Sequence, residues 1–167
     1  MGKEDAVTIA FMKKEDMDQV MAIEKASFSM PWSRNLFLSE FRSPLVSTLM
    51  VALASGQART VIGYLVFWNV ADEMHILNVA VKSEYRQQGI ARSLVLAGLI
   101  HAYAKGARRA FLEVRMSNIA AQKLYSELGF TGVSVRRDYY DFPVEDAVVM
   151  VMEQSVLESL ISRSKNG

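Results

Sequence analysis

The stretch from His75 to Ala104, HILNVAVKSEYRQQGIARSLVLAGLIHAYA, decides the fold of this chain. Its apolar run Ile76–Val81 predicts a strand covered on both faces, and the apolar run after Gly89 predicts a helix. Gly89 falls where this helix begins, and the first N–H groups of a helix have no partner inside it, so they can hold an anion. A glycine there lets a phosphate approach the backbone closely. An ordinary strand-to-helix turn is the alternative interpretation.

The composition predicts a globular protein. The chain has 167 residues, of which 51% are hydrophobic and 22% charged, so it can bury a sizeable core. We expect one domain over residues 1–153 and a tail over 154–167, with a weakly amphipathic pattern that allows a short helix. The net charge of +1 argues against a nucleic-acid surface as the main function.

Several residue types are scarce or absent. The chain has no cysteine, which excludes disulfides, thiolate metal sites and a thioester on the protein, and it has only two histidines. We therefore expect no metal. Residues 1–14 contain acidic side chains and no long apolar core, and no apolar run approaches the ~20 residues that span a bilayer. These features predict a cytoplasmic protein that does not bind membranes.

Hydrophobic periodicity and turn residues predict the other elements. In chain order these are a strand Val7–Met12, a helix capped by Asp16 and ending near Phe28, a short helix capped by Ser33, strands Leu45–Ala54 and Thr60–Val70, the strand His75–Val81, a helix Ile90–Lys105, a strand Ala110–Val114, a helix from Ser117 or Asn118 to Leu128, and strands Thr131–Tyr140 and Ala147–Met152. A helical crossover makes His75–Val81 and Ala110–Val114 parallel, whereas the other connections favour antiparallel neighbours. The pattern predicts a mixed α/β fold.

Several motifs resemble one enzyme family. Arg86, Gly89 and Ala91 fit the pyrophosphate-binding signature Gln/Arg-x-x-Gly-x-Gly/Ala of the GCN5-related N-acetyltransferases, the GNAT superfamily. Further segments fit at the spacing of this family: FSMPWS at 28–33, LEVRMSN at 112–118, LYSELGF at 124–130, RRDYY at 136–140 and EDA at 145–147. Together they are most similar to the bacterial ribosomal-protein alanine N-acetyltransferases, over residues 8–152. The resemblance implies the GNAT fold, a central mixed sheet of about seven strands flanked by about four helices, and acetyl-CoA as co-substrate.

Two residues are candidates for acid–base catalysis. An α-amino group has a pKa of about 8, so a modest general base suffices to deprotonate it. Glu113 is a lone carboxylate in an apolar strand, and the resemblance implies that it is the proton acceptor; the alternative is a residue that faces solvent or pairs with Arg115. The resemblance also implies that Tyr125 donates a proton to the departing CoA thiolate. A packed aromatic with a satisfied hydroxyl is the alternative for Tyr125.

The resemblance also assigns the cofactor contacts. The backbone of Val79, Ala80 and Val81 matches the segment that pairs with the pantetheine arm of CoA like an added strand. The loop and helix start that match the pyrophosphate site are Gln87, Gln88, Gly89, Ile90, Ala91 and Arg92. Asn118 matches a CoA-contacting asparagine, and capping of the following helix is compatible with that role.

The acceptor side is less constrained by the sequence. Trp32, Tyr139 and Tyr140 match segments that flank the peptide groove in the family, although a tryptophan such as Trp32 is more often a core aromatic than a contact residue. The connection Asp141–Val144 is shorter than is usual in the ribosomal-protein enzymes and lacks their glycine. His75 and His101 are interpreted as packing or surface residues.

The predicted function is direct transfer of acetyl from acetyl-CoA to the N-terminal α-amino group of a protein, an alanine of a ribosomal protein. Attack occurs in a ternary complex, because the absence of cysteine excludes a cysteine-linked intermediate. The alternatives are a lysine or small-amine acetyltransferase on the same fold, or a non-catalytic acyl-CoA-binding module. The sequence predicts no direct nucleic-acid partner and does not indicate an oligomeric state.

Overall fold

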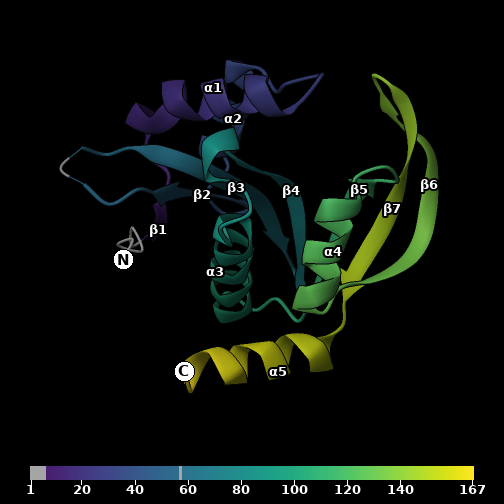
Figure 1. Cartoon of the computed structure of the whole chain (residues 1–167). Coiled ribbons are helices and arrows are strands. Elements are labelled where there is room, and N and C mark those ends of the chain that lie inside the picture. Colours follow the sequence, from purple (N-terminus) through teal and green to yellow (C-terminus); the bar gives the residue numbers. More distant parts are fainter. Residues whose placement is uncertain (1–6, 57) are drawn as a thin grey trace. The chain divides into compact units, whose positions relative to one another are not determined.

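The structure, a computed structural model, describes residues 7–56 and 58–167. The start of the predicted domain (1–6) and Gln57 in the loop between the two predicted strands lie outside the described residues. The elements are β1 (Thr8–Phe11), η1 (Lys14–Asp16), α1 (Met17–Ser27), α2 (Arg34–Phe41), β2 (Ser47–Leu53), β3 (Val61–Val70), β4 (Glu73–Val81), η2 (Ser83–Tyr85), α3 (Ile90–Ala104), β5 (Arg109–Arg115), α4 (Ile119–Leu128), β6 (Thr131–Asp141), β7 (Val144–Met152) and α5 (Gln154–Lys165) (Figure 1).

The strands form one mixed sheet. Within the described part of the chain, seven strands are hydrogen-bonded in the order β1-β2-β3-β4-β5-β7-β6. This confirms the predicted mixed α/β fold. The described residues hold five α-helices where about four were expected, because the predicted tail forms the complete helix α5.

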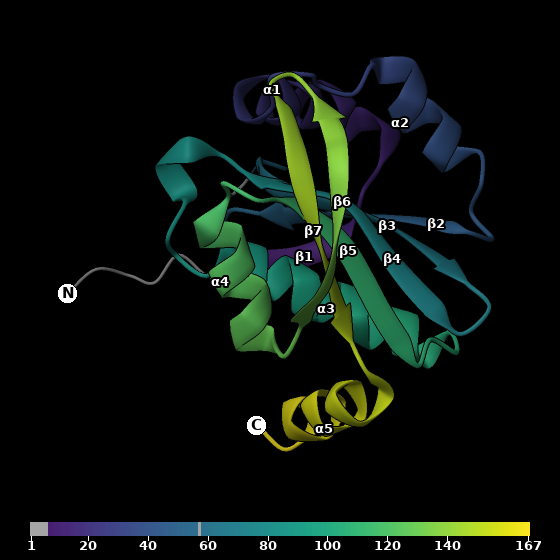
Figure 2. The ribbon, with the colours of Figure 1, turned by 90° about the vertical axis from the view of Figure 1, so that its right-hand side faces the viewer.

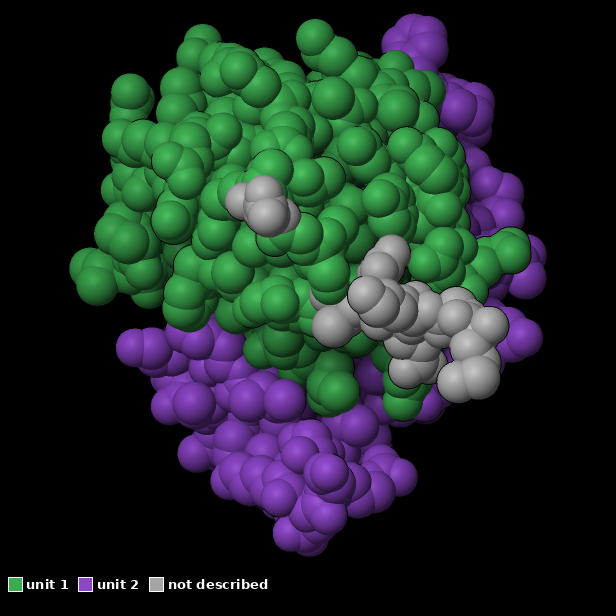
Figure 3. Space-filling model, turned by 60° about the vertical axis from the view of Figure 1, so that its left-hand side comes forward, with its two compact units in different colours: residues 1–67, 78–98 green, residues 68–77, 99–167 purple. Residues whose placement is uncertain are grey.

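The chain divides into two compact units, coloured separately in Figure 3. Unit 1 consists of Met1–Phe67 and Asn78–Gly98, and unit 2 of Trp68–Leu77 and Leu99–Gly167. The division therefore falls inside β3, β4 and α3. The single domain over residues 1–153 stays a prediction.

In unit 1, helices cover both faces of the strands. Figures 1 and 2 show α1 and α2 on one side and the first turns of α3 on the other. The apolar spacing of α1 explains its position, since Met17, Val20 and Ile23 are all buried. Gly63 in β3 permits close packing, because a Cβ there would lie 3.0 Å from the Ala80 carbonyl oxygen and 3.2 Å from Leu94 Cδ1.

Two helix caps were predicted in this unit. The Ser33 hydroxyl oxygen accepts a hydrogen bond from the Leu36 N–H at 3.2 Å, which confirms the cap of α2. Asp16 does precede α1, but its side chain makes no capping bond to that helix, so this part of the prediction is wrong. The buried Asp16 carboxylate instead accepts two bonds from Arg59, at 2.7 and 2.9 Å, and one from the Lys13 N–H.

In unit 2, β4 and β5 run parallel, as predicted, with Ile76 opposite Leu112. The pairs β5–β7 and β6–β7 are antiparallel. Strand β7 begins at Val144, three residues before the predicted Ala147, so only Phe142 and the cis-linked Pro143 separate it from β6. Figure 1 shows β6 and β7 as a long, curved hairpin.

Strand β4 is not covered equally on both faces. Met74, Ile76 and Ala80 are buried, whereas His75, Leu77 and Val79 are only half-buried. The prediction of coverage on both faces is therefore wrong for this strand. A run of apolar residues does not distinguish full coverage from an alternation in which one face stays partly open.

Helix α5 packs through one apolar face, with Leu157, Leu160 and Ile161 buried. Gly129 ends α4 at a left-handed φ of +114°, and a Cβ there would lie 2.6 Å from Val156 Cγ1 in α5. In the described residues, no helix is both long and apolar enough to cross a membrane.

Substitution of Gly129 should separate backbone strain from this steric conflict. Gly106 also has a left-handed φ, +106°, but a Cβ there would meet nothing within 4 Å. We expect Gly106→Ala to lower the free energy of unfolding by about 1 kcal/mol through strain alone. Gly129→Ala should lower it by about 1–3 kcal/mol more, because Val156 must also move. Urea unfolding of both variants measures the difference, and equal losses would contradict the predicted packing of α5.

Candidate active site

Glu113 is the central charged residue of unit 2. It lies on β5 with its side chain only 6% exposed, and its Oε2 lies 2.7 Å from His75 Nε2. Arg136 on β6 places a guanidinium nitrogen 3.7 Å from Glu113 Oε1. The alternative interpretation required Glu113 to face solvent or to pair with Arg115. The structure shows neither of these arrangements.

These neighbours keep Glu113 ionised. Burial by itself raises the pKa of a carboxyl, but the hydrogen bond and charge of His75, together with the charge of Arg136, outweigh it and lower the pKa of Glu113. Glu113 is thus a buried carboxylate that is stabilised from two sides.

His75 was not predicted as a site residue, and the structure places it in direct contact with Glu113. Its ring stacks on Phe111 with 4.2 Å between centroids, and the edge of Trp68 packs against it at 6.2 Å. The parallel register explains the contact, because His75 lies opposite Phe111 and Glu113 is two residues further along the same face. A histidine and a carboxylate at these offsets were the signal in the sequence, but only the register brings them together.

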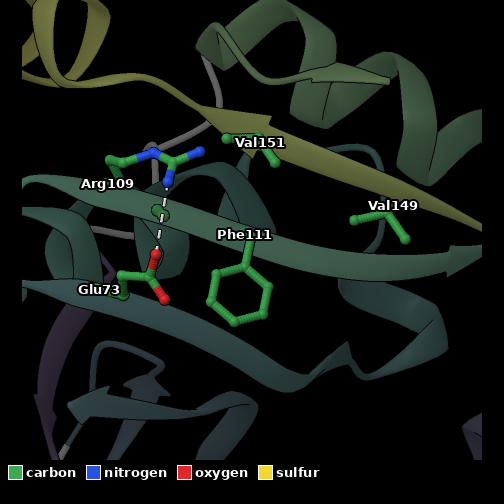
Figure 4. Close-up of a pocket in the computed structure, with 6 residues that line it drawn as sticks. Glu73, Arg109, Phe111, Val149 and Val151 are labelled. Carbon is green, nitrogen blue, oxygen red and sulfur yellow. Dashed lines mark hydrogen bonds and ion pairs between the residues drawn. The ribbon is translucent and has the colours of Figure 1, made fainter. Parts of the chain in front are cut away.

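A shallow hollow of about 220 Å³ lies beside Phe111 on this part of the sheet (Figure 4). It is lined by Glu73, Arg109, Ala110, Phe111, Val149 and Val151. Arg109 forms ion pairs with Glu73 at 3.5 Å and with Glu153 at 3.0 Å. None of the predicted site residues lines this hollow.

Tyr139 and Tyr140, both on β6, lie near Glu113 of β5. Their rings meet edge to face at 5.0 Å, with Arg136 over Tyr139 at 5.9 Å and Arg115 over Tyr140 at 4.1 Å. A register shift between Arg136 and Tyr140 interrupts the regular alternation of β6 here. Burial, followed by the neighbouring Tyr139, raises the pKa of Tyr140 to about 12.

Tyr125 lies on α4 and is only 5% exposed. Burial, followed by interaction with Tyr140, raises the pKa of its hydroxyl, so the group stays protonated in the neutral range. Its ring packs against Phe130 at 5.8 Å. Among the described residues, we find no hydrogen-bond partner for this hydroxyl, and a buried phenol usually has one.

The turn before α4 is fixed by Glu145 and Asn118. Glu145 accepts hydrogen bonds from the Ser117 N–H at 2.6 Å and from Arg115 at 3.3 Å. The Asn118 side chain accepts from the Ala121 N–H at 3.1 Å, so it caps α4. Its expected contact with CoA stays a prediction.

Apart from Asn118, which belongs to unit 2, the predicted cofactor residues belong to unit 1. The loop from Arg86 to Gly89 is exposed, with left-handed φ values of +60° at Gln87 and +77° at Gly89, and α3 begins at the next residue. Its exposed backbone leads into the unpaired N–H groups of the first turn of α3, and this arrangement suits a phosphate. The side chain of the exposed Arg86 bonds back to the protein instead, donating to the Val81 carbonyl at 3.0 Å and to the Ser27 hydroxyl at 3.2 Å.

Trp32 is half-buried between α1 and α2. Its backbone N–H donates to the carboxylate of Glu24 at 2.8 Å, and its ring packs on Phe37 at 5.2 Å. Glu24 is 1% exposed and also accepts hydrogen bonds from Asn78, at 2.9 Å, and from the Tyr64 hydroxyl. The sequence analysis missed this buried carboxylate, since a glutamate within a helix usually faces solvent.

Comparison with known proteins supports the interpretation of these motifs. The sequence profile of the acetyltransferase (GNAT) family matches residues 17–130. The chain belongs to the GNAT acetyltransferase family. In the described residues, no group of three or more histidine, aspartate or glutamate side chains could hold a metal ion.

Individual relatives match most of the chain. A Bacillus subtilis protein named as a candidate ribosomal protein bS18-alanine N-acetyltransferase is 37% identical and covers 83% of this chain and 90% of its own length. The ribosomal protein bS18-alanine N-acetyltransferase of Escherichia coli K12 is 30% identical, and the match covers 89% of this chain and 99% of that enzyme. The crystal structure of the Escherichia coli enzyme superposes with a TM-score of 0.79 at 29% identity. The superposition covers 89% of this chain and 94% of the Escherichia coli chain.

The lowered pKa of Glu113 predicts how this GNAT acetyltransferase responds to acid. A group with a lowered folded-state pKa contributes stability above its ordinary pKa, near 4.5, and this contribution is lost as the pH falls through the folded value. We expect the free energy of unfolding to fall more steeply between neutral pH and pH ~3 in the parent than in Glu113→Gln. Urea unfolding across this range measures the slopes.

Glu127→Gln on α4 is the control, because the Glu127 side chain is 56% exposed and forms a long surface ion pair with Lys123 at 3.9 Å. It should keep the parent slope. Parallel curves for the parent and Glu113→Gln would contradict the ionised state assigned to Glu113.

Proposed function

We propose that this enzyme transfers the acetyl group of acetyl-CoA to the N-terminal α-amine of a ribosomal protein of the bS18 type, at an alanine. The observation that carries the proposal is that relatives named for this activity match 83–89% of the chain at 30–37% identity. Ribosomal proteins are made in the cytoplasm, so the function places the enzyme there. The catalytic domain in this proposal is residues 1–153.

Residues of unit 1 would bind the co-substrate. The backbone of Val79–Val81 would pair with the pantetheine arm, and an N–H of this strand would polarise the thioester carbonyl. Residues Gln87–Arg92 would bind the pyrophosphate, since their loop is exposed and leads into a helix N-terminus. Asn118 of unit 2 would contact CoA while it caps α4.

Residues of unit 2 would move the protons. Glu113 would act as the general base for the attacking amine, directly or through a group that it orients, because it is ionised and buried beside polar groups. Tyr125 donates to the departing sulfur, and its protonated hydroxyl has no competing partner among the described residues. Trp32, Tyr139 and Tyr140 would line the acceptor groove.

A peptide panel tests the acceptor. Peptides that begin with alanine, methionine or serine, each with an internal lysine, are incubated with acetyl-CoA and sequenced by mass spectrometry. We expect acetylation at the α-amine and fastest on alanine. Acetylation confined to lysine ε-amines would identify a lysine acetyltransferase, and acetyl-CoA binding without turnover on any amine would identify a binding module.

The role of Tyr125 is tested by Tyr125→Phe. Loss of a general acid should lower kcat about 10²-fold or more, while the Kd for acetyl-CoA measured by calorimetry stays unchanged. Tyr103→Phe on α3 is the matched control, since that ring packs under Arg108 at 4.6 Å and has no proposed role in the reaction. Parent-like turnover of Tyr125→Phe would reject the assignment.

A further inference from the structure

His75 makes an interaction that the proposed roles of Glu113 and Tyr125 do not use. Its Nε2 lies 2.7 Å from Glu113 Oε2, and its ring is fixed between Phe111 and Trp68. The side chain is 22% exposed, so the ring is not sealed from solvent or substrate. The contact therefore combines a fixed ring with partial exposure of its side chain.

The short contact determines where the protons lie. Two lone pairs cannot face each other at 2.7 Å, so a proton lies between Nε2 and Oε2. Because His75 and Arg136 keep Glu113 ionised, this proton belongs to Nε2. In the neutral form of the ring this proton stays on Nε2 and the lone pair lies on Nδ1, so the hydrogen bond at one ring nitrogen fixes the chemistry of the other.

We propose that Glu113 acts as a pair with His75, in which Nδ1 of His75 accepts the proton that the attacking amine loses and Glu113 orients the ring. This inference rests on the proposed acetyl transfer. The amine nitrogen bonds to the thioester carbon and the C–S bond breaks. The sulfur leaves with a proton from Tyr125, and the nitrogen proton goes to Nδ1. The resulting imidazolium is stabilised by the Glu113 carboxylate.

The pair suits this step better than the carboxylate alone. An ammonium with a pKa of about 8 transfers a proton poorly to a carboxylate, whose ordinary pKa is about 4.3, whereas imidazole titrates close to neutral pH. Carboxylates orient catalytic histidine bases in the same way in enzymes of unrelated folds.

The charged and titratable groups around the pair come from three strands. Glu113 on β5 favours a positive charge on the His75 ring. Arg136 on β6 disfavours that charge, and its guanidinium nitrogen lies 3.7 Å from Glu113 Oε1, the carboxylate oxygen that does not contact His75. Tyr139 and Tyr140 on β6 interact with Glu113 and stay neutral at physiological pH. Glu73 on β4 and Arg109 on β5 lie on the same face, and they pair with each other at 3.5 Å.

Kinetics test whether His75 takes part in the proton transfer. In His75→Gln we expect kcat to fall about 10²-fold and the acid limb of kcat/KM to move to lower pH by about one unit or more, because the remaining base is a carboxylate and no longer an imidazole. His101→Gln removes the other histidine of the chain and should keep the parent profile. An unchanged acid limb in His75→Gln would overturn the proposal and leave Glu113 as the sole base.

The pH profile of kcat/KM is measured with whichever amine the peptide panel shows to be acetylated, so an error in the proposed acceptor does not affect this test.

A second measurement needs no turnover. In the 15N-histidine-labelled parent, at a pH above the acid limb of kcat/KM, NMR should show His75 protonated at Nε2 and bare at Nδ1, with the His101→Gln spectrum giving the assignment. A proton on Nδ1 of His75 would overturn the inference even if His75→Gln failed to fold.

Discussion

The parallel pairing of β4 with β5 is the constraint on which the candidate active site depends. It sets Glu73–Ile76 beside Arg109–Leu112 and thereby brings a histidine of one strand to a glutamate of the other. Side chains alternate along a strand, so a slip of one residue would turn one of these two groups to the opposite face. The catalytic proposal therefore depends on register as much as on residue type.

Buried carboxylates recur in both units, and each is stabilised differently. Asp16 is neutralised by the guanidinium of Arg59, whereas Glu24 is held by neutral donors from Trp32 and Asn78 and by Tyr64. Glu113 has a histidine and a more distant arginine. Removal of a buried charge from water is expensive without such partners. The first two carboxylates fix loops and strands, and only the third of these lies against a histidine.

Much of the fold could be predicted from local signals. Ser33, Asn118 and Gly129 mark helix ends because their side chains or their backbone freedom satisfy groups that the helix leaves unpaired. The predictions failed where local and tertiary preferences compete. Asp16 is a good capping residue, but its carboxylate binds Arg59, which is 43 residues away. The sequence of α5 predicts only a weakly amphipathic tail. Its helix is stabilised by packing within its own unit, and this packing has no local signal in the sequence.

The sequence by itself determined the order of elements, the parallel crossover, the exposed glycine loop before α3 and the family of motifs around Glu113 and Tyr125. These follow from periodicity, turn chemistry and residue spacing, which are properties of neighbouring residues. Only the tertiary structure decided that His75 contacts Glu113, that Arg86 donates to the Val81 carbonyl, and that Glu24 accepts a hydrogen bond from the backbone of Trp32. Such contacts join residues far apart in the chain, and the register and packing that create them have no local signature in the sequence.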